Sequence, residues 1–99
     1  MPFQIPELLA EPKATPQNPC LGFVVDKGMS IPKKENQFCS IIPMNSSEVI
    51  VTLKGFHYNL NSRVLKFGET MGVSNYVEED FGRIIVEKGI CAVILSYNV

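Results

Sequence analysis

The chain has 99 residues, a net charge of −1 and a pI near 5.8, and charged residues make up only 19% of it. This length fits one domain and excludes two. The near-neutral charge argues against nucleic-acid binding, which usually relies on a basic patch. No apolar run approaches about 18 residues and no signal-peptide pattern follows Met1, which argues against a membrane span and against secretion. We therefore expect a cytoplasmic protein that contacts neither nucleic acid nor membrane.

The N-terminal stretch 1–19 differs in composition from the rest, because it holds five of the seven prolines. Each proline removes a backbone donor and favours extended geometry in the residue before it. One helical turn at 6–10 would fit, with Pro6 at its first position. The stretch also carries four apolar side chains that we expect to contact a partner: Phe3, Ile5, Leu8 and Leu9. We predict an extended arm over 1–19, pinned against its own domain, a sister subunit or a larger partner.

Residues 20–99 combine alternating apolar side chains with frequent turn residues, which predicts about seven short β-strands. The expected strands cover 22–26, 38–42, 47–54, 56–60, 63–67, 82–87 and 90–97, with a turn at 61–62. A helical turn capped by Ser74 is expected within 74–81. The pattern predicts an all-β fold, in which 20–99 form a single compact domain built as a small β-sandwich or β-barrel.

A Lys-Gly pair between apolar residues occurs three times, at 27–28, 54–55 and 88–89. The unequal spacing excludes a structural repeat. Three-residue hairpin loops need a residue with positive φ, which glycine adopts without steric cost. We therefore predict turns at all three pairs. A phosphate-binding loop would need more glycines and a following helix.

Residues with catalytic or metal-binding chemistry are sparse. His57 is the only histidine, and the three cysteines Cys20, Cys39 and Cys91 form no closely spaced ligand pair. We expect buried, reduced cysteines and a solvated or hydrogen-bonded His57. Lys33-Lys34 and the acidic run 78–80 are expected to be solvated. The sequence therefore predicts no catalytic residue, no cofactor and no metal site, and hence no enzyme.

The arm, the low charge and the small β domain together indicate a protein that acts by contact. In layout, the chain resembles small phage capsid decoration proteins, which pair an extended N-terminal segment with a small β domain. The resemblance implies a virion accessory protein that stabilises a capsid, binding the larger assembly or itself as a homo-oligomer such as a trimer.

Two alternatives from other classes stay open. The first is a small inhibitor or adaptor that occludes a host or defence enzyme, with contacts from the loops at 30–37 and 71–81. The second is a small β-barrel enzyme or ligand-binding protein, which would require a pocket around His57.

Overall fold

The computed structural model describes residues 12–44, 48–66 and 75–98, and these residues form seven β-strands and no helix. The strands are β1 (Cys20–Val25), β2 (Gly28–Pro32), β3 (Gln37–Pro43), β4 (Val49–Lys54), β5 (Leu60–Leu65), β6 (Phe81–Lys88) and β7 (Cys91–Tyr97). The prediction of an all-β domain with about seven strands is confirmed. The expected arm contacts Phe3, Ile5, Leu8 and Leu9 and the expected helical turn at 6–10 lie outside the described residues.

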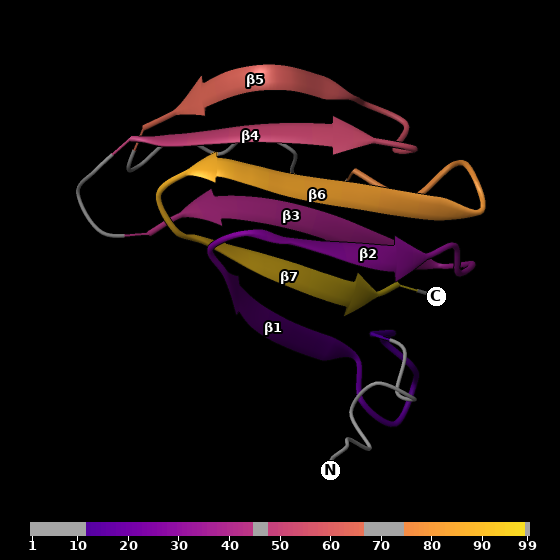
Figure 1. Cartoon of the computed structure of the whole chain (residues 1–99). Coiled ribbons are helices and arrows are strands. Elements are labelled where there is room, and N and C mark those ends of the chain that lie inside the picture. Colours follow the sequence, from indigo (N-terminus) through magenta and orange to yellow (C-terminus); the bar gives the residue numbers. More distant parts are fainter. Residues whose placement is uncertain (1–11, 45–47, 67–74, 99) are drawn as a thin grey trace, which may run out of the picture.

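The strands form two antiparallel sheets, one of three strands in the order β1-β7-β3 and one of four in the order β2-β6-β4-β5. In Figure 1, β5 and β1 lie at opposite margins of the molecule, each at the edge of its own sheet. The two sheets are separate, so the architecture is a β-sandwich rather than a closed barrel. Consecutive strands from β1 to β4 alternate between the sheets, which ties the two layers together through the chain.

The core lies between the sheets and is built from alternate residues of each strand. Along β7, Cys91, Val93 and Leu95 are fully buried, whereas the side chains between them are half-buried on the other face. β6 follows the same alternation with Ile84 and Val86. This period of two is what a sheet with one covered face requires. β7 pairs with both β1 and β3, so the most continuously apolar segment of the sequence is the central strand of its sheet.

The end of the predicted arm packs on the domain that follows it. Ala14 is fully buried in the core, and its backbone N–H donates to the side-chain Oε1 of buried Gln37 at 2.5 Å. Further along, the Tyr97 N–H donates to the carbonyl of Pro19 at 2.7 Å. These contacts attach the described part of the arm, residues 12–19, to β3 and β7.

Two of the three Lys-Gly pairs take the predicted turn conformation. Gly55 and Gly89 have φ values of 81° and 88°. Gly55 begins the connection between the paired strands β4 and β5, whereas Gly89 connects β6 to β7 in the other sheet. The prediction is wrong at Gly28, which lies inside β2. A Cβ at this position would come within 2.7 Å of the Ile84 carbonyl oxygen, so Gly28 permits close strand approach instead of a turn.

Two further local predictions are wrong for reasons of tertiary structure. The turn expected at 61–62 lies within β5, where Ser62 has a positive φ of 47° and interrupts the β4–β5 register between Val51 and Leu53. The helical turn expected within 74–81 is absent over 75–81, where Asn75 bridges to Cys39, Val77 bridges to Phe56, and a bend at 79–80 leads into β6. Long-range pairing outweighs the local helix-capping signal there.

The side chain of Thr52 in β4 contacts Ser62 in β5 and Glu87 in β6 on the outer face of the four-stranded sheet. These contacts lie where the strand register is irregular. Its hydroxyl accepts the Ser62 backbone N–H at 2.9 Å and donates to the Glu87 carboxylate at 2.6 Å. The Ser62 hydroxyl lies 2.8 and 3.0 Å from the two Glu87 oxygens. Glu87 itself falls at the register shift between β4 and β6. The hydrogen bond from Thr52, followed by that from Ser62, lowers the pKa of Glu87 from its ordinary value of 4.5.

Replacing Thr52 with valine keeps the shape of the side chain but removes the central hydroxyl. We expect Thr52→Val to lower the free energy of unfolding by about 1 kcal/mol, because the Ser62 N–H loses its acceptor. Urea unfolding at about pH 7 measures this. In a double-mutant cycle, the loss should be smaller in a Glu87→Ala background, and additive losses would contradict the proposed network.

The Glu87 carboxylate predicts a pH dependence of stability. Since its pKa is lowered in the folded state, its contribution is complete above the ordinary value of 4.5 and is lost as the pH falls through the lowered value. We therefore expect Glu87→Gln to be less stable than the wild type at about pH 7 and to match it more closely at about pH 3. Thermal unfolding at both pH values measures the difference. The difference in stability between wild type and Glu87→Gln should become smaller when both proteins also carry Thr52→Val. An unchanged difference would show that the Thr52 hydroxyl does not cause it.

Candidate functional site

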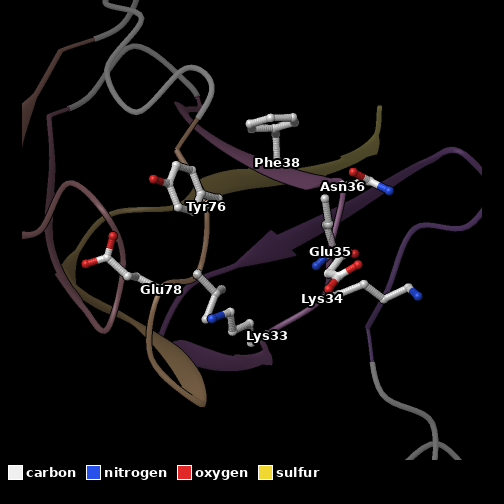
Figure 2. A pocket seen from close by; sticks show the side chains of 9 residues that line it. Lys33, Lys34, Glu35, Asn36, Phe38, Tyr76 and Glu78 are labelled. Carbon is white, nitrogen blue, oxygen red and sulfur yellow. The ribbon is translucent and has the colours of Figure 1, made fainter. Parts of the chain in front are cut away.

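An open pocket of about 430 Å³ lies where the connection between β2 and β3 faces the segment before β6. We call it the aromatic pocket, and its lining residues are Lys33, Lys34, Glu35, Asn36, Gln37, Phe38, Tyr76, Val77 and Glu78 (Figure 2). One wall therefore comes from residues 33–38 and the other from residues 76–78. The pocket is large enough for a small organic molecule.

Backbone hydrogen bonds from β3 and from the connection between β4 and β5 hold the wall at 75–79 in place. On one side, the Cys39 N–H of β3 donates to the Asn75 carbonyl at 2.7 Å. On the other side, the His57 N–H donates to the Tyr76 carbonyl at 2.9 Å, and the Gly55 carbonyl accepts from Glu78 and Glu79 at 2.8 and 3.1 Å. This segment therefore spans from the three-stranded sheet to the connection after β4.

Gly82 allows the wall to lie close to the sheet. A Cβ on Gly82 would come within 2.8 Å of both the Phe56 ring and a methyl group of Val77. Phe56 and Val77 are buried and bridge to each other. The missing side chain of Gly82 thus lets these two residues pack against β6, and their packing places Tyr76 and Glu78 beside the pocket.

Asn75 is the buried polar residue of this wall, with 1% of its surface exposed. Its Oδ1 accepts backbone N–H groups of Tyr58 and Tyr76, both at 3.0 Å, and its Nδ2 donates to the Tyr58 carbonyl at 2.9 Å. A carboxamide satisfies both groups of Tyr58 because it is donor and acceptor at once. Asn75 therefore fastens the 56–59 connection to the pocket wall.

A row of aromatic rings follows from this arrangement. The His57 ring stacks on Tyr76, with centroids 4.7 Å apart and planes 13° from parallel. Phe38 meets Tyr76 edge to face at 6.2 Å, and Tyr58 meets His57 edge to face at 4.4 Å. Figure 2 shows Tyr76 between Phe38 and Glu78. The row joins residues from β3, the 56–59 connection and the segment before β6.

The charges around the row have both signs. His57 Nδ1 lies 2.8 Å from Glu78 Oε1, so Nδ1 carries the proton that the carboxylate accepts. Lys33, Lys34 and Glu35 are exposed on the opposite wall. Aromatic faces beside a carboxylate attract flat, positively charged groups. The side of the pocket formed by Tyr76 and Glu78 therefore offers a favourable surface for a small aromatic cation, whereas Lys33 and Lys34 balance the two carboxylates in the lining as a whole.

The cysteine thiols take no part in this site. Cys39 and Cys91 are buried, and burial raises their pKa values to about 12 and about 11, with a smaller contribution from Cys91 at Cys39. Such thiols are poor nucleophiles at neutral pH. The expectation of buried cysteines holds for these two and is wrong for Cys20, which is exposed. Among the described residues, no three His, Cys, Asp or Glu side chains form a metal-binding group.

The sequence did not predict this pocket. The loops at 30–37 and 71–81, expected under one alternative to contact a partner enzyme, contribute most of the lining through the parts that the structure describes. His57 is hydrogen-bonded, as predicted, and it also stacks on a pocket residue. Phe38 and Tyr76 were not singled out as site residues. One signal for a site residue was present in the sequence here. Tyr76 is an aromatic residue within a polar stretch that shows neither helical nor strand periodicity.

Two antiparallel sheets and a pocket lined with aromatic residues define the class of this protein as a small β-sandwich domain with an aromatic pocket among its described residues. The model of the family described as "Thiamin pyrophosphokinase, vitamin B1 binding domain" matches residues 28–91, about two thirds of the chain. The chain belongs to this family. The match includes every residue that lines the aromatic pocket.

Solved structures support the same relationship. The crystal structure of thiamine pyrophosphokinase from Bacillus subtilis is 29% identical, with a TM-score of 0.75, over 82% of this chain and 39% of that one. That of thiamin pyrophosphokinase from Geobacillus thermodenitrificans is 23% identical, with a TM-score of 0.71, over 81% of this chain and 38% of that one. The chain thus spans about two fifths of the length of these relatives. No curated protein compared with the chain gives a significant match.

These findings overturn the function expected from the layout. The expectation of a capsid decoration protein is wrong, and the expectation that the chain is unconnected with an enzyme is contradicted as well, because the chain matches the vitamin B1 binding domain of thiamin pyrophosphokinases. The structural relatives give no support to a virion location. The layout resemblance failed because it depended on the arm and the domain size and on no residue pattern. Within the part of the chain that the structure describes, no helix is long and apolar enough to cross a membrane.

Asn75 provides a test of how the pocket is built. Asn75→Asp keeps an acceptor for the two N–H groups but replaces the donor to the Tyr58 carbonyl with a second acceptor. We expect it to cost about 1–3 kcal/mol of unfolding free energy and to separate the His57 and Tyr76 rings.

Chemical shifts of the His57 and Tyr76 ring protons report that separation, and urea unfolding reports the stability. Gln17→Glu, the same amide-to-acid change at an exposed position, serves as the control. An Asn75→Asp protein with unchanged ring shifts would show that the carboxamide does not position the row.

Proposed function

We propose that this chain binds vitamin B1 in the aromatic pocket and serves as the vitamin-binding part of a thiamin pyrophosphokinase. The match of the family model to residues 28–91 carries the proposal. The relatives in solved structures are described as pyrophosphokinases of this vitamin. Because the chain spans about two fifths of their length, we assign the binding step to it and propose that the transfer of the pyrophosphate group needs the part of these proteins that it does not span.

The chemistry of the pocket supports the proposal independently. Vitamin B1 joins an aminopyrimidine ring to a thiazolium ring that carries a permanent positive charge. Phe38 and Tyr76 supply apolar ring surface for flat heterocycles, and Glu78 supplies a negative charge beside them. A pocket with these features can hold both rings and favours the cationic one.

The expectations about partners stay predictions. We still expect a protein contact, either with the same chain or with a larger assembly, and contact with neither nucleic acid nor membrane. Apolar side chains that suit a protein contact are Val24 and Ile42 on the outer face of the three-stranded sheet, 71% and 43% exposed. We still expect the chain to be synthesised in the cytoplasm.

Isothermal titration of the full chain with thiamin tests the proposal. We expect binding to the wild type and a loss of about 1–3 kcal/mol of binding free energy in Phe38→Ala and in Tyr76→Ala, because each removes ring surface from the pocket. Phe81→Ala is the matched control, since Phe81 is 55% exposed and does not line the pocket. Failure of the wild type to bind thiamin, or equal loss in all three variants, would refute the assignment of this site.

A further inference from the structure

His57 shares two neighbours with any cation that enters the aromatic pocket. Its ring lies flat against Tyr76 at 4.7 Å, and its Nδ1 lies 2.8 Å from the Glu78 carboxylate. Tyr76 and Glu78 both line the pocket. The carboxylate and the ring that would attract a positive ligand are therefore already in contact with a side chain that can itself become positive.

The charge state of His57 decides how much attraction remains for the ligand. Histidine is the side chain whose ordinary titration falls between pH 5 and 8. When neutral, His57 donates one hydrogen bond and leaves the charge of Glu78 available to the ligand. When protonated, it forms an ion pair with Glu78 and a cation–π contact with Tyr76, and its own charge repels a cation in the pocket.

The other groups around His57 do not duplicate this role. On its own connection, the Tyr58 ring meets it edge to face. From the segment before β6 it faces Tyr76 and Glu78. The charged residues on the opposite wall are Lys33, Lys34 and Glu35. His57 is the only histidine of the chain, and histidine is the side-chain type that acts as a switch near neutral pH.

We infer that the His57–Glu78 pair selects a positively charged ligand for the aromatic pocket, and that protonation of His57 releases it. The inference rests on the proposed function and adds to it a residue that determines specificity and a direction of pH dependence. Affinity for the cationic vitamin falls when His57 becomes protonated. Since the thiazolium charge is permanent, the protein side of the contact carries this change.

The test is isothermal titration of the full chain with thiamin at about pH 6 and about pH 8, using wild type, His57→Gln and Glu78→Gln. We expect the wild type to bind roughly two- to fivefold more weakly at the lower pH, the range typical of one exposed ionic contact. Glutamine at position 57 can still donate to Glu78 but does not titrate, so His57→Gln should bind equally at both pH values. Glu78→Gln should bind roughly two- to fivefold more weakly than wild type at about pH 8.

The outcomes separate the inference from the proposed function. Wild-type binding that is independent of pH, or a pH dependence that persists in His57→Gln, overturns the inference and leaves the vitamin site in place. The second result would also assign the titration to the ligand or to another residue. No thiamin binding at either pH refutes the proposed function and the inference together. Circular dichroism of each variant at both pH values shows that the fold is intact, so that a change in affinity reports on the site.

Discussion

The buried carboxamide of Asn75 is the contact on which the site depends. It satisfies a donor and an acceptor of Tyr58 from inside the molecule, where an unpaired polar group would cost free energy. The neighbouring backbone at 75–79 bonds to β3 on one side and to the connection after β4 on the other. The aromatic row is a consequence of this junction, because Tyr76 reaches Phe38 and His57 only when the junction is formed.

Much of the fold could be predicted from the sequence because burial in a two-layer sandwich repeats every two residues. The Ile- and Val-rich segments that became β6 and β7 show this directly. β2 was missed because its outward positions are Gly28, Ser30 and Pro32, which look like a turn, and only Met29 and Ile31 face inward. Ser74 suggested a helix cap, but bridges to residues distant in the sequence took the following segment into extended geometry. Local signals fail where long-range pairing decides the conformation.

The site was harder to predict than the fold. The loops around Lys33 and Glu78 could be recognised as contact regions because they are polar and lie between strands. The aromatic row forms only because particular connections between strands lie side by side and bring Phe38, His57 and Tyr76 together. Strand periodicity does not show which connections are neighbours in space. The function was misjudged for a related reason. The family match depends on residues spread over 28–91, whereas the layout resemblance depended on the arm and on the size of the domain.

Each wall of the pocket reaches both layers of the sandwich, since residues 33–38 lead from β2 into β3 and the backbone at 75–79 bonds to β3 and to the connection after β4. This links occupancy to folding. A ligand held between residues 33–38 and 76–78 binds only when both layers are assembled, so its binding free energy adds to that of the fold. At a concentration about 100 times its dissociation constant, such a ligand adds roughly 2.7 kcal/mol, a large share of the stability of a domain with a modest core. Under the proposed function, the same linkage would shorten the lifetime of the empty protein in a cell short of the vitamin, so supply of the ligand and abundance of its binder would rise and fall together.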